Sequence, residues 1–284
     1  MIVVTGANGQ LGRLVIKHLI SKVDASEIVA AVRTPEKASD LAALGVQVRE
    51  ADYSKPETLK KAFEGAEKVL LISSSEVGQR TQQHINVIDA AKNEGVSLIA
   101  YTSLLHVDIS PLGLATEHIE TEKYLKENKV PFVLLRNGWY TENYLASVAP
   151  SIEHGAFIGS AGEGQISSAS RNDYAEAAAV VLTSEEPQAG KVYELAGDES
   201  YTLANLAAVI SRETGKQIPY VNLPQNEFKE ALIGAGLSEP FAALLANSDA
   251  GASLGGLFDD SRELNGLIGR PTTDLSEMIK AIIA

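Results

Sequence analysis

The chain has 284 residues, 45% of them hydrophobic, so it can bury a core in one large domain or in a main domain with a smaller partner. It carries 24 Lys and Arg against 37 Asp and Glu, and a formal charge of −13 disfavours binding to nucleic-acid phosphates. The sequence has no cysteine, which excludes disulfides, thiolate catalysis and cysteine-ligated metal sites.

Strand-like sequence follows Met1 directly, without the basic and apolar segments of a secretory leader, and no apolar run has the length of a membrane span. We therefore expect a cytoplasmic protein without a membrane partner. The histidines lack metal-ligand spacing, so we expect no metal site. A monomer and a homodimer are both compatible with the sequence.

Short β-branched runs alternate with helical patterns in the first half of the chain. In chain order, we expect strands at 1–5, 27–33, 46–50, 68–73, 97–103 and 131–136, and intervening helices at 10–21, 35–44, 56–64, 80–93 and 116–128. The strands are apolar throughout, which indicates burial on both faces, and the helices fit right-handed crossovers. This pattern predicts an α/β fold with a Rossmann-like, doubly wound parallel sheet.

The alternation weakens after Arg136, where several glycines crowd one loop region. We expect later elements as helices from Asp173 and after Thr202, strands at 191–197 and 217–223, helices at 228–236 and 239–248, and a final helix after Pro271. These pieces predict a smaller, mixed C-terminal lobe. We place the Rossmann domain at 1–150 and the lobe at 151–284, interleaved with the sheet because 191–197 could return to it.

The first strand runs into GANGQLG, with glycines at 6, 9 and 12. A strand that turns into a helix here aims amide N–H groups at one point, the helix dipole favours an anion, and glycine lets a pyrophosphate approach. A tight turn without a ligand is the alternative. Because the motif stands at the first βα junction, we favour a dinucleotide site. The expected contacts come from Gly6, Ala7, Asn8, Gly9, Gln10 and Leu11.

The end of the second strand, AAVRTP, has no acidic residue where NAD sites usually carry one. Arg33 could instead pair with a 2′-phosphate, which favours NADPH, although it could also be a solvated strand end. After the fourth strand, Ser73, Ser74 and Ser75 could meet the ribose next to the nicotinamide, or could form a polar turn without a ligand.

The glycine spacing resembles that of extended and atypical short-chain dehydrogenases, whose ordinary members carry Tyr-x-x-x-Lys after strand five. None of the nine tyrosines has a lysine four residues later, and Ile119 stands four residues before Lys123. Two interpretations follow. The chain is either a reductase whose acceptor needs little proton assistance, or a nucleotide-binding protein without turnover.

Seven segments together resemble the bacterial NADPH:quinone oxidoreductases of the NmrA-like, atypical short-chain dehydrogenase family: GANGQLG, AVRTP, LLISSSEVGQR, AYTSLLH, HIETEK, LLRNGWYTENY and GGLFDDS. Triphenylmethane dye reductases are similar in fewer segments. The resemblance implies that NADPH lies across the carboxyl edge of the sheet. It further implies hydride transfer to a quinone beneath the C-terminal lobe, without flavin or metal.

The resemblance implies further coenzyme contacts in two segments. One would form the nicotinamide-side wall with Asn137, Gly138, Trp139, Tyr140, Thr141 and Glu142. The other would close over the coenzyme with Ala169, Ser170, Arg171, Asn172, Asp173 and Tyr174. Trp139 and Tyr140 could stack on a quinone or fill the seam between domains, and Asp173 could be a helix N-cap instead.

The catalytic group stays open, with Lys123, Tyr140 and His106 as weak candidates. A salt-bridged, solvated face is the alternative for Lys123, which has acidic neighbours. His106 follows strand five and could donate to a quinone oxygen. Two other functions compete with quinone reduction: a non-catalytic NADP(H)-sensing regulator of NmrA type, and reduction of triphenylmethane or azo dyes.

Overall fold

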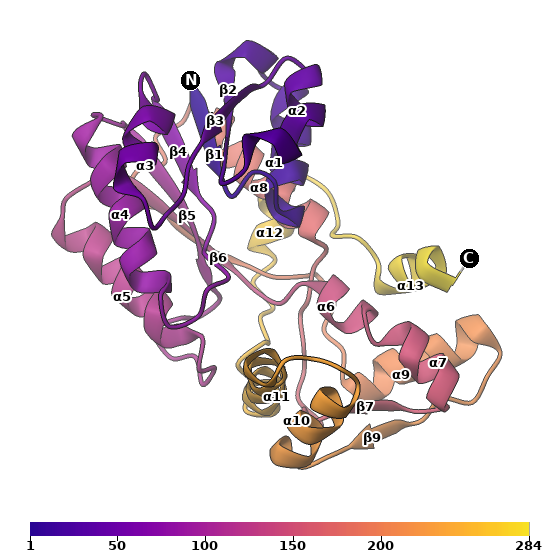
Figure 1. Ribbon diagram of the computed structural model, residues 1–284. Coiled ribbons are helices and arrows are strands. Elements are labelled where there is room, and N and C mark those ends of the chain that lie inside the picture. The colour runs from indigo at the N-terminus through magenta and orange to yellow at the C-terminus, as the bar shows by residue number, and fades with distance from the viewer. Residues whose placement is uncertain (284) are drawn as a thin grey trace. The chain divides into compact units, whose positions relative to one another are not determined.

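The computed structural model describes residues 1–283, which form two compact units (Figure 1). The sheet unit comprises residues 1–104, 116–137 and 171–193, and the C-terminal unit comprises 105–115, 138–170 and the described part of 194–284. The sequence analysis expected a division at residue 150 with the lobe interleaved with the sheet, whereas each unit here consists of several separate segments. The difference arises because the helix at 171–183 packs against the first helix of the chain, which returns it to the sheet unit.

The predicted sheet is present. Its strands are β1 (Ile2–Thr5), β2 (Ile28–Val32), β3 (Gln47–Glu50), β4 (Lys68–Leu71), β5 (Leu98–Leu104), β6 (Phe132–Asn137) and β8 (Val192–Leu195). The strand order is β3-β2-β1-β4-β5-β6-β8, and the five pairings from β3 through β6 are parallel. The Rossmann-like, doubly wound fold is therefore confirmed.

Helices cover both faces of this sheet (Figure 1). They are α1 (Gln10–Ile20), α2 (Ser39–Ala43), α3 (Pro56–Phe63), α4 (Arg80–Asn93), α5 (Ala115–Glu127) and α8 (Arg171–Thr183). α1 packs with α8, and α3 packs with α4. The helix expected at 35–44 is interrupted, because Ala38 leaves the helical conformation and separates a 3₁₀ turn (Pro35–Ala38) from α2.

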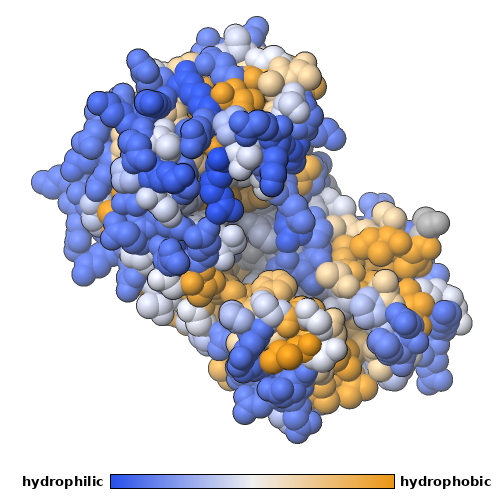
Figure 2. Space-filling model, in the orientation of Figure 1, coloured by the Kyte–Doolittle hydropathy of each residue, from blue (hydrophilic) through white to orange (hydrophobic). Residues whose placement is uncertain are grey.

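Burial on both faces explains the apolar strands. Every residue of β1, β2 and β5 is buried, and the side chains of Val3, Val69 and Ile99 belong to one core cluster with residues of α3 and α4, including Phe63 and Ile88. No position of β1, β2 or β5 faces water, so these strands do not alternate between apolar and polar residues. By contrast, the visible outer surface of this unit is largely hydrophilic (Figure 2).

The direction of the strand order reverses between β1 and β4. The chain places β2 and β3 on one side of β1, and β4, β5 and β6 on the other. The loops that leave β1 and β4 therefore start side by side at the carboxyl edge, and Ile72 N–H donates to Thr5 Oγ1 at 3.2 Å. Open α/β sheets bind ligands at such a reversal, which places the candidate site here.

The C-terminal unit has its own small parallel sheet of β7 (Phe157–Gly159) and β9 (Tyr220–Asn222). Its helices are α6 (Thr141–Leu145), α7 (Val148–His154), α9 (Leu203–Thr214), α10 (Gln225–Gly234), α11 (Glu239–Ser253), α12 (Glu263–Ile268) and α13 (Leu275–Ile283). Thr202 caps α9 in a reciprocal capping box with Asn205. Within residues 1–283, no helix is both long and apolar enough to cross a membrane.

A cavity of about 350 Å³ lies among α7, α9 and α13 of the C-terminal unit. Its lining residues are Val148, Ala149, Ile152, Glu213, Thr214, Lys216, Ile282 and Ile283. Figure 2 shows hydrophobic surface in the region where Figure 1 labels α7 and α13. None of the predicted site residues lines this cavity, so it is separate from the candidate coenzyme site.

Candidate functional site

The turn after β1 has the features of an anion site. Gly6 adopts a left-handed φ of +59°, and Gly9 caps α1 without a side-chain hydrogen bond. A Cβ on Gly12 would stand 2.6 Å from the carbonyl oxygen of Gly6, so α1 starts directly against the turn. The first turn of α1 contains no acidic side chain. The Gly9 N–H donates to the carbonyl oxygen of Gly6 at 2.9 Å, so the amides at the start of α1 and the positive end of that helix are the groups that suit a pyrophosphate here.

Arg13 holds this turn from the side. Its Nε donates to the carbonyl oxygen of Asn8 at 3.2 Å, and its guanidinium also hydrogen bonds to the Asn8 side chain and to the carboxylate of Asp40. The hydrogen bond from Arg13 lowers the pKa of Asp40, which keeps this pair charged. The Asn8 side chain is thus engaged within the protein, so its contribution to a coenzyme would come from the backbone.

Tyr53 also supports the turn, although no sequence pattern indicates this role. Its hydroxyl donates to the carbonyl oxygen of Ile72 at 2.8 Å and also hydrogen bonds to the hydroxyl of Thr5. Burial raises the pKa of Tyr53, so the hydroxyl stays protonated. Because Thr5 ends β1 and Ile72 follows β4, this side chain ties together the two loops at the reversal of strand order.

Arg33 stands at the end of β2, as predicted, and its side chain is 65% exposed. Its Nη1 lies 2.7 Å from Oε1 of Glu76, in the loop after β4. The other carboxylate oxygen of Glu76 accepts from Nε2 of Gln83 at 2.7 Å. No local pattern indicates this ion pair, because its partners are separated by 43 residues.

Side chains from α4 hold the loop of Ser73, Ser74 and Ser75. Ser74 N–H donates to Nε2 of His84 at 2.9 Å, so that nitrogen must be the unprotonated one. Arg80 Nε donates to the carbonyl oxygen of Ser74 at 2.6 Å. Burial, with a smaller contribution from Arg80, lowers the pKa of His84 to about 3. His84 is therefore neutral near pH 7 and can accept this hydrogen bond.

The segment from Asn137 to Glu142 crosses the boundary between the two units. Asn137 ends β6 in the sheet unit and is 5% exposed, and its Oδ1 has no hydrogen-bond partner among residues 1–283. Trp139 lies in the C-terminal unit and is buried, with its ring centroid 6.4 Å from that of Tyr144. Tyr140 is partly exposed. Asn137 thus presents an acceptor that a bound amide or hydroxyl could use.

Two predicted segments meet inside the C-terminal unit. Tyr140 and Ala169 form a parallel bridge, Ala169 N–H donates to the carbonyl oxygen of Trp139 at 3.1 Å, and Thr141 N–H donates to that of Ala169 at 3.0 Å. The side chain of Thr141 also hydrogen bonds to Ser168. Gly138, Glu142 and Ser170 belong to this unit as well.

The rest of the second segment lies in α8 of the sheet unit. Asn172 Oδ1 is 3.0 Å from Nε2 of His18 in α1, and Tyr174 is buried. α8 begins at Arg171, so Asp173 lies inside its first turn rather than before it. The N-cap alternative for Asp173 is therefore wrong, because the helix starts two residues earlier than the sequence pattern indicated.

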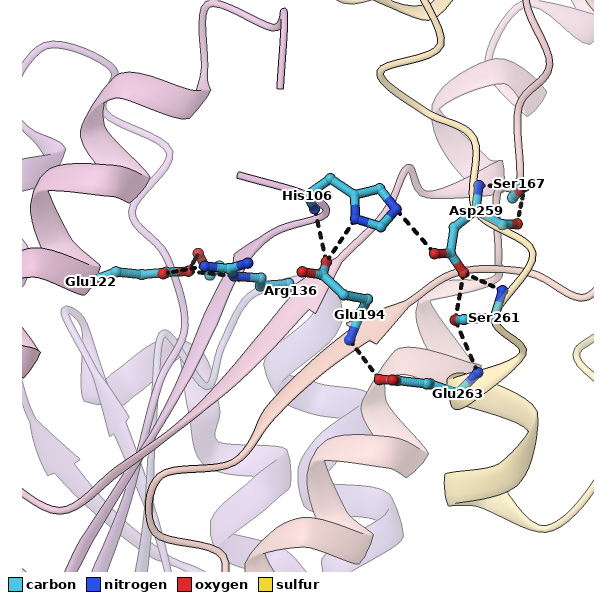
Figure 3. A network of polar contacts seen from close by, with 9 residues as sticks. His106, Glu122, Arg136, Ser167, Glu194, Asp259, Ser261 and Glu263 are labelled. Carbon is cyan, nitrogen blue, oxygen red and sulfur yellow. Dashed lines mark hydrogen bonds and ion pairs between the residues drawn. The ribbon is translucent and has the colours of Figure 1, made fainter. Parts of the chain in front are cut away.

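Lys123 lies on the outer side of α5. Its side chain is 70% exposed, and its Nζ lies 3.7 Å from Glu127. The preceding residue, Glu122, is buried and receives hydrogen bonds from Nε and Nη2 of Arg136 at 2.9 and 2.6 Å (Figure 3). Successive helical residues point about 100° apart, so Lys123 faces away from this pair. Lys123 therefore lies on a salt-bridged, solvated helix face, which was the alternative to a catalytic role.

The buried tyrosine of β5 does not replace the missing dyad. The hydroxyl of Tyr101 lies 2.7 Å from Nδ1 of His118, and both side chains are buried. Burial raises the pKa of Tyr101 and lowers that of His118. Tyr101 therefore remains a neutral phenol in the core.

His106 is held between two acidic residues of the C-terminal unit (Figure 3). The backbone N–H of His106 donates to Oε2 of Glu194 at 2.8 Å, and its ring Nε2 lies 3.0 Å from Oδ2 of Asp259. Asp259 in turn accepts from the Ser261 N–H and belongs to the GGLFDDS segment. The backbone of His106 has a φ of +48°, in the left-handed region that few residues other than glycine adopt. His106 and Asp259 thus join the AYTSLLH segment to the GGLFDDS segment.

The buried carboxyl of Asp249 gives a pH prediction for the C-terminal unit. It accepts from Tyr144 Oη at 3.0 Å and from Ser160 N–H at 2.9 Å, and burial raises its pKa to about 6. The folded chain therefore binds this proton up to a higher pH than the unfolded chain, so Asp249 lowers stability progressively between about pH 4 and 6.

We expect Asp249→Asn to remove this loss, because its amide can donate to Tyr144 and accept from Ser160. Its stability relative to the natural chain should rise by about 1 kcal/mol for each pH unit in that window and then level off. Urea unfolding at pH 4, 5, 6 and 7 measures this difference. If the stability difference between Asp249→Asn and the natural chain did not change with pH, the raised pKa of Asp249 would be contradicted.

Known oxidoreductases match this chain over nearly its whole length. Escherichia coli (strain K12) "Quinone oxidoreductase 2" is 59% identical over 98% of this chain and 97% of its own length. The solved structure of an E. coli NADPH-dependent quinone oxidoreductase with NADPH matches with a TM-score of 0.97 at 58% identity and covers 100% of both chains. Citrobacter sp. triphenylmethane reductase complexed with NADP(H) matches at 0.95 and 41%, covering 99% of this chain and 100% of its own.

A doubly wound parallel sheet, with a glycine turn and an uncapped helix after its first strand, defines a Rossmann-type protein. The family model for the NmrA-like family matches residues 1–252. The chain belongs to the NmrA-like family.

Proposed function

We propose that this protein is an NADPH-dependent reductase that transfers hydride directly to quinones. The 59% identity to E. coli quinone oxidoreductase 2 over nearly the full length of both chains carries this proposal. The match to the NADPH complex of the E. coli enzyme supports the coenzyme.

The sheet unit supplies the groups that would hold NADPH. The turn from Gly6 to Leu11 and the start of α1 would bind the pyrophosphate, through N–H groups other than those of Ala7 and Gly9, which donate to the carbonyl oxygens of Ala31 and Gly6. Arg33 would bind the 2′-phosphate. The loop of Ser73 to Ser75 would face the ribose on the nicotinamide side, and its hydrogen bonds to His84 and Arg80 hold it in place beforehand. We also propose contacts from both segments at 137–142 and 169–174.

The chemistry suits a chain without Tyr-x-x-x-Lys. Bound NADPH would supply hydride, and a quinone that accepted it would become an aromatic phenolate, which water can protonate after the transfer. The protein then needs chiefly to position the reactants and to exclude water, rather than to donate a proton during transfer. We retain Tyr140 as the candidate for contact with the acceptor. His106 is a weaker candidate, because its imidazole is already engaged by Asp259.

The test is steady-state oxidation of NADPH with benzoquinone-type acceptors. We expect saturable turnover that depends on both substrates. Triphenylmethane and azo dyes are tested in parallel, because one relative in the comparison reduces triphenylmethane dyes by name. Faster turnover of a dye than of every quinone would make the dye reductase the better assignment. Coenzyme binding without turnover of any acceptor would favour a non-catalytic regulator.

We further propose a cytoplasmic location. Size-exclusion chromatography with light scattering distinguishes a monomer from a homodimer.

A further inference from the structure

The ion pair between Arg33 and Glu76 occupies the guanidinium to which we assign the 2′-phosphate. Arg33 Nη1 donates to Glu76 Oε1 at 2.7 Å, and both side chains are substantially exposed. A phosphate monoester carries about −1.5 to −2 charges at neutral pH, against −1 for the carboxylate, and can bind a guanidinium through two parallel hydrogen bonds. An arriving 2′-phosphate therefore competes with Glu76 for the same group.

The second carboxylate oxygen of Glu76 is also hydrogen bonded, which limits how far the carboxylate can move from Arg33. Its second oxygen accepts from Gln83 Nε2 at 2.7 Å, and Gln83 is buried. The Oε1 of Gln83 in turn accepts from the hydroxyl of Ser74. A displaced carboxylate that keeps this hydrogen bond stays close to Arg33 and repels the phosphate.

We propose that Glu76 is an internal counter-ion of Arg33 that the 2′-phosphate must displace, and that it limits the affinity for phosphorylated coenzyme. This inference rests on the proposed use of NADPH. Glu76 acts through Arg33, so it is a specificity-determining residue rather than a catalytic one. The hydrogen bonds from Glu76 through Gln83 to Ser74 also connect the 2′-phosphate position to the loop on the nicotinamide side.

The test compares 2′,5′-ADP with 5′-ADP, which lacks the 2′-phosphate, by isothermal titration calorimetry. Glu76→Gln keeps the size of the side chain and removes its charge. We expect it to bind 2′,5′-ADP about two- to tenfold more tightly, since exposed ion pairs are weak and the lost repulsion adds to the effect. The affinity for 5′-ADP should stay the same. In an Arg33→Ala background, the gain from Glu76→Gln should shrink markedly.

The matched control is Glu67→Gln, which removes the same charge from the exposed turn before β4, at the opposite edge of the sheet. It should leave both affinities unchanged. Equal changes for both ligands in Glu76→Gln, or weaker binding of 2′,5′-ADP, would overturn the role of Glu76 while leaving the proposed function intact. If the natural chain binds neither 2′,5′-ADP nor NADPH, the proposed coenzyme and this inference both fail.

Discussion

Gly12→Ala is expected to weaken NADPH binding by at least about tenfold, the equivalent of about 1.4 kcal/mol. The new Cβ would stand 2.6 Å from the carbonyl oxygen of Gly6 and 2.7 Å from Cα of Ala7. Both neighbours are backbone atoms, so the turn or the start of α1 must move. Overpacking of this kind costs about 1–3 kcal/mol of stability and moves the amides that would bind the pyrophosphate.

The matched control is Gly266→Ala in α12. Gly266 also lies inside a helix, but a Cβ there would have no atom within 4 Å. We expect unchanged coenzyme binding and a small gain in stability, because alanine is the better helix former. Calorimetry and thermal unfolding of both variants give the comparison. Equal coenzyme affinity in Gly12→Ala and the natural chain would show that this turn does not bind the pyrophosphate.

Arg33→Ala is expected to weaken NADPH binding by about ten- to a hundredfold, because a hydrogen bond to a charged group contributes about 1.5–3 kcal/mol. NADH has no 2′-phosphate, so its affinity should change little. Arg33→Lys should fall between these limits, since an ammonium group keeps the charge but cannot form two parallel hydrogen bonds.

The ratio of kcat/KM for NADPH to that for NADH, measured with one quinone, reports this selectivity. If Arg33 had only a structural role, its replacement would lower kcat/KM for NADPH and for NADH by the same factor. Equal losses for the two coenzymes would therefore contradict the assigned phosphate contact.

The sheet and its glycine turn were predictable because their signals are local. Strands buried on both faces must be apolar over their whole length, and this pattern located β1, β2, β4, β5 and β6. β3 lies at the edge of the sheet, is mostly polar and ends at the exposed Glu50, so the expectation of apolar strands throughout is wrong for it. Thr202 likewise signalled the start of α9 through the capping preference of threonine. The short elements α6, α7, α12 and β7 were not predicted, because each is too brief to establish a periodic pattern.

The supports of the site were harder to predict, because they depend on contacts between distant residues. Tyr53 is 48 residues from Thr5, and Glu76 is 43 residues from Arg33. His84 has no metal-ligand spacing to other histidines, and its local sequence does not indicate that its ring accepts a hydrogen bond from Ser74. Nothing in the local sequence distinguishes these side chains from ordinary polar residues. Only the order of the strands brings their loops together.

The sequence indicated that the later lobe interleaves with the sheet through 191–197, but it did not indicate that α8 also returns to the sheet unit. Helix α8 starts at Arg171, well inside the expected lobe, yet it packs on α1 and belongs to the sheet unit. Its composition is rich in alanine, which suits close packing between helices but does not reveal the partner. A contiguous division by sequence cannot represent a chain that returns to its first unit.

Isothermal titration calorimetry of the natural chain with NADPH, and separately with NADH, tests the central claim most directly. The glycine turn and Arg33 predict saturable binding of one NADPH per chain, with NADH at least about tenfold weaker for want of the 2′-phosphate contact. No saturable binding of NADPH, or equal affinity for both coenzymes, would contradict the account.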